Sequence, residues 1–392
     1  MTVEFFDLAR RLYAAKTRKP VMQVAASLFT MGMNTIFVDA EKPESGPASA
    51  TIWRHGAAPT TVTGGVPVLR ALAAAGAVMD PHGFTPQLVV QDGASLAVLE
   101  NVARAAARHD DDAVRGASAV VGWWVDRSGY PGTNAVVDLL AHSRQRYITG
   151  AIPSREQEAK YWRGVFALGD GPAGTEAWAS RIAKGDPLEL AAIIRENDAY
   201  AYRAAAERFA QGWSWTGKEP APIAAMGLRA RCESADLWEA ALRTDRLWRH
   251  RAVHTGHVTG GTVTSATRST FTVACPRMGS RLRAGSDIVG WIGGVDSADR
   301  AVIFHGEIQS AEAHGGELHL TVARVQAANR PSIGHWVTLM PAPPNDRIVR
   351  MSRSRYRRLL FQGDSWIAAG KPPGVRRRDV PLDVLVAAAE TD

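Results

Sequence analysis

The chain contains very little cysteine: only Cys232 and Cys275 occur among its 392 residues. They lie far apart and outside any CxxC pair, which excludes a disulfide-stapled scaffold and a zinc ribbon and fits a reducing compartment. Long apolar runs are also missing, because no stretch reaches the 18 or more residues expected of a membrane-spanning helix. Residues 1–7 carry acids where a signal peptide would carry Lys or Arg. The sequence therefore predicts a cytoplasmic protein without a membrane partner.

Acidic residues are the scarcer charge, since 39 Asp and Glu oppose 46 Lys and Arg and leave a net charge of +7. The excess is concentrated in residues 347–378, which hold ten Lys or Arg and a single acid, Asp364. Aromatic rings are interleaved with these cations, as expected of a surface that follows a phosphate backbone and stacks on bases. A solvated basic tail is the alternative interpretation. The residues predicted here to contact nucleic acid are Arg353, Arg355, Tyr356, Arg357, Arg358, Arg376, Arg377 and Arg378.

The first 150 residues have the pattern of an α/β domain that begins with a helix over about residues 4–30. Short β-rich runs and longer apolar, Ala-rich runs alternate after that helix. The expected strands are 35–39, 51–54, 60–63, 87–92 and 117–125. The expected helices are 66–78, 94–109 and 133–147. This order, three strands followed by alternating helices and strands, predicts an α/β layer with mixed strand directions.

The rest of the chain divides into three segments of different composition. Residues 151–251 are rich in Ala, Arg and Trp and predict a helical connector. Residues 252–342 contain short alternating runs separated by evenly spaced turn signals, which predicts a small β-barrel. Residues 343–392 form a basic C-terminal extension.

Three carboxylates stand at the ends of expected elements in the first domain. Asp39 ends the first strand before a Pro/Gly/Ser-rich hairpin, and Asp92 ends the fourth strand before a small polar helix start. Asp138 lies in the expected helix after the fifth strand, and Ser128 and Asn134 lie in the glycine-containing loop before it. On these residues, positions 34–147 resemble the ribonuclease H fold.

The resemblance implies that Asp39, Asp92 and Asp138 meet at one edge of the sheet and hold Mg²⁺ or Mn²⁺. Hard divalent cations prefer oxygen ligands, and two ions about 4 Å apart can activate water and stabilise the leaving oxygen of a phosphodiester. The implied activity is hydrolysis of RNA or of an RNA–DNA hybrid. The loop with Ser128 and Asn134 is then expected to approach the nucleic acid.

Two departures from the family's pattern keep a second function open. The expected helix 66–78 contains no Glu where the family has its second acid. Ser128 stands where the family's loop usually has His, so a base that titrates near neutral pH is missing. The alternative is a non-catalytic scaffold that binds RNA or DNA and recruits a helicase or nuclease partner. A protein–protein module without a nucleic-acid role is a third hypothesis.

Each candidate residue also has a structural interpretation. Asp39 and Asp92 precede small residues and are typical turn formers at strand ends. Asp138 would favour the positive end of its helix, and Asn134 could cap or clamp the helix start. The agreement of three positions with the order of elements favours the joint site.

Overall fold

The computed structural model describes residues 3–217 and 221–344. The larger of the chain's two compact units, residues 1–217 and 231–344, contains both the mixed sheet and the antiparallel sheet described below. None of the helices in the described ranges combines the length and apolar character that crossing a membrane requires.

A five-stranded mixed sheet organises the first domain. Its strands are β2 (Thr35–Glu41), β3 (Ser49–Arg54), β4 (Thr60–Thr63), β5 (Gln87–Val90) and β6 (Val136–Asp138). They lie in the spatial order β4-β3-β2-β5-β6. The first three strands pair antiparallel, whereas β5 runs parallel to both β2 and β6. The three parallel strands β2, β5 and β6 therefore end at the same edge of the sheet.

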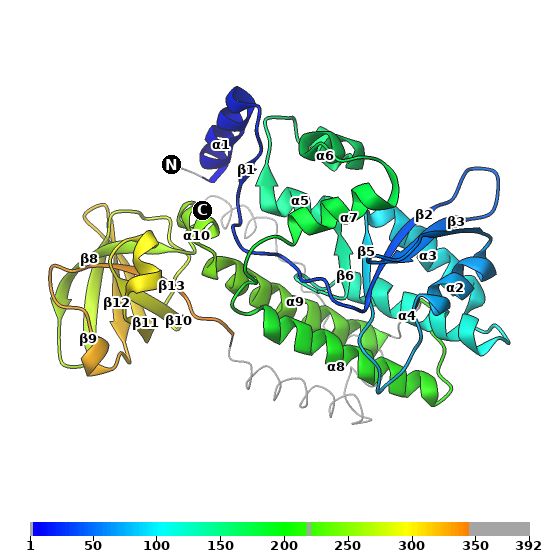
Figure 1. Ribbon diagram of the computed structural model, residues 1–392. Coiled ribbons are helices and arrows are strands. Elements are labelled where there is room, and N and C mark those ends of the chain that lie inside the picture. The colour runs from blue at the N-terminus through cyan, green and yellow to red at the C-terminus, as the bar shows by residue number, and fades with distance from the viewer. Residues whose placement is uncertain (1–2, 218–220, 345–392) are drawn as a thin grey trace, which may run out of the picture. The chain divides into compact units, whose positions relative to one another are not determined.

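Helices cover both faces of this sheet (Figure 1). Alternate side chains of a strand point to opposite faces, so Ile36 and Val38 join one core and Phe37 joins the other. The first core includes side chains of α2 (Gly65–Ala74), α3 (Gly93–Ala106) and α4 (Asp112–Ser128). The second includes Trp162 of α6 (Ala159–Phe166) and Trp178 of α7 (Gly171–Ile182). Burial on both faces explains why the central strands are continuously apolar.

The expected strand at 117–125 is wrong, because this segment lies inside helix α4. Asp111 caps the helix by accepting from the Ala113 N–H at 2.9 Å, and Gly129 follows its last residue. Every residue from Ala117 to Trp124 is buried. A helix that is buried all round shows no polar face, so its pattern cannot be distinguished from that of a buried strand.

The fifth strand is instead β6, which lies inside the expected helix 133–147. Helix α5 follows directly and is confined to Leu139–Arg146, before the short strand β7 (Tyr147–Ile148). The expected N-terminal helix is also shorter, since α1 spans Val3–Thr17 and β1 (Val21–Met22) then pairs antiparallel with β7. Strands of two or three residues are too short to show a period in the sequence.

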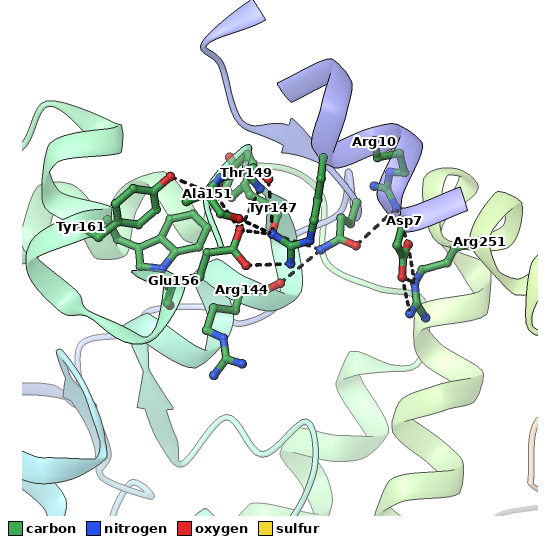
Figure 2. A network of polar contacts seen from close by, with 12 residues as sticks. Asp7, Arg10, Arg144, Tyr147, Thr149, Ala151, Glu156, Tyr161 and Arg251 are labelled. Atoms are coloured by element: carbon green, nitrogen blue, oxygen red, sulfur yellow. Dashed lines mark hydrogen bonds and ion pairs between the residues drawn. The ribbon is translucent and has the colours of Figure 1, made fainter. Parts of the chain in front are cut away.

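Helix α1 is attached to this α/β region by charged side chains (Figure 2). The Arg11 guanidinium donates to both carboxylate oxygens of Glu156, at 2.9 and 2.8 Å. At the start of the same helix, Asp7 accepts from Arg251 at 2.9 Å. The N-terminal helix is thus joined to η1 (Arg155–Gln157) and to α10 (Arg246–His254).

Residues 151–251 are mainly helical. Besides η1, α6, α7 and α10, this segment contains α8 (Ala191–Ala210) and α9 (Ala221–Thr244). Trp162 and Trp178 are fully buried here, and each indole N–H donates a hydrogen bond, to Glu156 O and to Ser143 Oγ respectively, both at 2.8 Å. These two indoles therefore serve as core anchors.

Six antiparallel strands follow and close on themselves. They are β8 (Thr259–Ala266), β9 (Thr270–Cys275), β10 (Asp287–Ile292), β11 (Ile303–His314), β12 (Glu317–Ala323) and β13 (Trp336–Pro341). The order is β10-β11-β12-β9-β8-β13, and β13 pairs back with β10. The 3-10 helix η2 (Val295–Arg300) lies between β10 and β11, and η3 (Ala327–Asn329) lies between β12 and β13. Buried Phe271, Phe304 and Leu320 contribute to the interior core.

Candidate active site at the carboxyl edge of the sheet

The strand register brings the three predicted carboxylates to one edge of the sheet. Val38 of β2 lies beside Val90 of β5, and Val90 lies beside Asp138 of β6. Asp39 follows Val38 directly, and Asp92 comes two residues after Val90. Because these strands are parallel, all three acids lie at their carboxyl ends.

Two of these acids also cap helices. Asp92 accepts from the Ala94 N–H at 3.1 Å and is the N-cap of α3. Asp138 accepts from the Ala141 N–H at 2.9 Å and is the N-cap of α5. The expected position of Asp138 within a helix is therefore wrong, because it is the last residue of β6. Both acids therefore have a structural role as helix caps, and one oxygen of each carboxylate is used for it.

The charge of Asp92 affects both of the other carboxylates. Loss of hydration is the main cause that raises the pKa of the Asp39 carboxyl; Arg163 opposes it, while Glu41 and Asp92 add to it. Loss of hydration is also the main cause that raises the pKa of Asp138. The hydrogen bond from the Ala141 N–H lowers this pKa, and the charge of Asp92 raises it. The charge of Asp92 thus contributes to the raised pKa of both Asp39 and Asp138. Such accumulated negative charge favours a cation at this edge.

Gln91 and Arg163 complete the surroundings of Asp39, and no pattern in the sequence points to either residue. The Gln91 amide donates to Asp39 Oδ2 at 2.9 Å, and Arg163 Nε donates to Gln91 Oε1 at 3.3 Å. Arg163 is held in turn by Thr175 Oγ1, to which it donates at 2.8 Å. These contacts span 52 and 72 positions along the chain, so only the folded structure brings them together.

His142 lies one turn beyond Asp138 on α5 and was also missed. Its Nδ1 lies 2.7 Å from the Asp138 carbonyl oxygen, which can only accept, so Nδ1 carries the proton. Phe29 packs edge-on against the ring at 5.4 Å. Burial lowers the pKa of His142, so the imidazole is neutral at neutral pH. The only sequence signal for His142 is its position four residues after Asp138, which is the spacing of neighbours on one face of a helix.

The predicted loop residues lie elsewhere. Ser128 is the last residue of α4, and its hydroxyl donates to Val125 O at 2.8 Å. The Asn134 side chain accepts from the Thr30 N–H at 2.9 Å and donates to Thr30 O at 3.2 Å. Both residues precede β6 and are therefore not part of the carboxyl edge. The loop with Ser128 and Asn134 thus lies before β6 and not beside Asp138 at the carboxyl edge, and its expected approach to nucleic acid stays a prediction.

The metal-ligand chemistry of the edge is incomplete in two respects. Helix α2 contains no acid, so the family's second carboxylate has no counterpart there. Across residues 3–217 and 221–344, no group of three or more His, Cys, Asp or Glu side chains is arranged so that it could hold a metal ion.

The residues of the basic extension that were predicted to contact nucleic acid lie outside the described residues. They are Arg353, Arg355, Tyr356, Arg357, Arg358, Arg376, Arg377 and Arg378.

The chain was also compared with known proteins. No protein-family model matches it, and no curated protein and no solved structure shows a significant match either.

Proposed function

We propose that the chain binds nucleic acid and that its first domain, residues 1–150, is ribonuclease H-like. In this proposal, Asp39, Asp92 and Asp138 support metal-dependent hydrolysis of a phosphodiester in RNA or an RNA–DNA hybrid. The observation that carries the proposal is the placement of all three at the carboxyl edge of β2, β5 and β6. The order of three antiparallel strands, then helices alternating with two parallel strands, agrees with the resemblance.

The donor set fits Mg²⁺ or Mn²⁺ by its chemistry. Such ions prefer oxygen ligands and are often bound by one or two carboxylates together with water and substrate phosphate, so three protein ligands are not required. In the described part of the chain, Asp39 Oδ1 and Asp92 Oδ2 accept no hydrogen bond from the protein. When bound, the ion would supply an activated water and stabilise the leaving oxygen. The protein's part is to hold the carboxylates, and Gln91 fixes the orientation of Asp39.

A second candidate function is a non-catalytic scaffold that binds nucleic acid and recruits a helicase or nuclease. Two observations favour it. Asp92 and Asp138 already serve as helix caps, which gives them a structural reason to be there. Helix α2 also lacks the acid that would complete the set.

Asp92→Asn distinguishes these functions. Asparagine caps a helix as well as aspartate does, so α3 should form, while the charge between Asp39 and Asp138 is lost. We expect cleavage of a labelled RNA–DNA hybrid in Mg²⁺ or Mn²⁺ to fall about a hundredfold, the size of effect seen when a group that stabilises a transition state is removed. Binding to the same hybrid at low salt should remain.

The matched control is Asp111→Asn, which changes another helix-capping aspartate, at the start of α4. It should cleave as the unmodified protein does. Absence of cleavage by the unmodified protein in both metals would contradict hydrolysis and leave the scaffold. Absence of salt-dependent binding to RNA, DNA and the hybrid would contradict both functions.

A further inference from the structure

A second candidate site lies at the opposite edge of the same sheet. A hollow of about 300 Å³ opens where β2 and β5 begin, lined among others by Thr30, Phe84, Gln87, Asn134 and Arg195. Its volume is at the lower end of the range of small-molecule sites. The strands β2 and β5 run from this edge of the sheet to the opposite edge. The hollow is therefore separate from the site of Asp39, Asp92 and Asp138.

Arg195 gives the hollow a cation. Its guanidinium donates to Thr30 Oγ1 at 3.3 Å, and it makes no ion pair with any residue in 3–217 or 221–344. Asp198 also lines the hollow, but its charge is already used by a buried ion pair with Arg127. The same carboxylate accepts from the Asn134 N–H at 2.7 Å. The balance of these charges is positive and favours an anion.

The walls of the hollow are fixed before any ligand arrives. The Gln87 amide donates to Thr30 O at 2.9 Å and to Asn134 O at 2.8 Å. The Asn134 side chain in turn accepts a hydrogen bond from the Thr30 N–H at 2.9 Å. These bonds tie the segment before β2 to the starts of β5 and β6, so a ligand would meet a preorganised surface.

Phe84 supplies an aromatic ring to the same hollow. Its side chain is 85% exposed although it lines the hollow. An exposed ring is able to stack on a planar ligand, and stacking on aromatic side chains is a sequence-tolerant way to bind nucleobases. A guanidinium suits phosphate because it offers several donors in a planar fork.

We propose that this hollow binds a nucleotide, with the phosphate on Arg195 and the base against Phe84. Two kinds of ligand carry this combination of phosphate and base: a free nucleoside monophosphate and the phosphorylated 5′ end of a nucleic-acid strand. The proposal rests on the amino edge of the sheet alone and holds whether or not the carboxyl edge hydrolyses phosphodiesters.

Titration calorimetry of the full chain tests this site with adenosine 5′-monophosphate, uridine 5′-monophosphate and adenosine. We expect saturable binding of both monophosphates and at least tenfold weaker binding of adenosine. Arg195→Met should weaken adenosine 5′-monophosphate binding at least tenfold, and Phe84→Ala about tenfold. Arg208→Met, an exposed arginine of the same helix, should leave it unchanged. Phe84 is exposed, so its variant tests the site even if Arg195→Met fails to fold.

A pair of oligonucleotides, one 5′-phosphorylated and one 5′-hydroxylated, separates the two kinds of ligand. Tighter binding of the phosphorylated strand than of the monophosphate identifies a strand end, and the reverse identifies a free nucleotide. Binding that survives both Arg195→Met and Phe84→Ala, or no binding of any phosphorylated probe, would overturn the proposal. Asp92→Asn should bind adenosine 5′-monophosphate normally, so failure here is distinguishable from failure at the carboxyl edge.

Discussion

Replacing Asp198 by alanine is expected to lower the free energy of unfolding by about 3–5 kcal/mol. The Asp198 side chain is almost completely buried and forms an ion pair with Arg127, which is also buried. It accepts two further hydrogen bonds, from Thr133 Oγ1 at 2.9 Å and from the Asn134 N–H at 2.7 Å. Removing the carboxylate leaves a buried guanidinium without its partner, which is the costly way to break such a pair.

The same network explains the segment between α4 and β6. Arg127 comes from α4, Asp198 from α8, and Thr133 and Asn134 from the turn that leads into β6. Arg127 also lies 4.0 Å from the centre of the Tyr130 ring, so the turn packs on the guanidinium as well. The turn at residues 129–134, which leads into β6, is therefore held by a buried charge pair.

Urea unfolding followed by circular dichroism measures this effect, with Asp112→Ala as the control. Asp112 forms an exposed ion pair with Arg115 at the start of α4, and pairs of that kind contribute about 1 kcal/mol or less. Asp198→Asn should fall between the two, because it retains a hydrogen-bond acceptor but loses the charge. Equal losses for Asp198→Ala and Asp112→Ala would contradict the proposed role of the buried pair.

The sequence predicted the parts of the fold whose pattern is local. Strands β2 to β5 and helices α2 and α3 lie close to their expected positions, because turn signals bound β-rich runs and small polar residues start the helices. The segment 117–125 of helix α4 was mistaken for a strand because residues 117–124 are all buried and show no polar face. Strand β6 was missed because three residues show no period. The error in α4 also misplaced the loop containing Ser128 and Asn134.

The candidate site was predictable in its acids and not in its surroundings. Asp39 and Asp92 follow apolar strand runs, and acids in that position meet at one edge whenever the strands are parallel. Asp138 was identified although the element assigned to it was wrong. The Arg163–Gln91–Asp39 chain joins residues from separate elements, and no local pattern encodes such a contact. Long-range polar contacts of this kind require the fold itself.

Replacing Glu156 by alanine is the second change with a large expected effect, about 3 kcal/mol of unfolding free energy, again because one member of a largely buried pair is removed. Figure 2 shows its environment. Besides Arg11, the carboxylate accepts from the Thr149 N–H at 3.0 Å and from Thr149 Oγ1 at 2.5 Å. The loss should loosen α1 from β7 and η1, since Arg11 provides the link.

The pH dependence of this contribution follows from the same contacts. Burial alone would raise the pKa of Glu156, but the hydrogen bonds from Arg11 and Thr149 outweigh it and hold the pKa below its ordinary value. A lowered folded-state pKa means that the ionised form stabilises the fold. The contribution is therefore fully present above the unfolded-state pKa of about 4.3 and is lost as the pH falls through the folded-state value.

Comparison with Glu156→Gln isolates that charge, because glutamine cannot titrate and preserves the side-chain shape. The difference in unfolding free energy between the unmodified protein and Glu156→Gln should be largest at pH 7 and should shrink as the pH falls below about 4. Glu158→Gln, an exposed neighbour, should show a small difference at every pH. A Glu156→Gln difference that is independent of pH would mean that shape and hydrogen bonding, rather than the carboxylate charge, attach α1 to the domain.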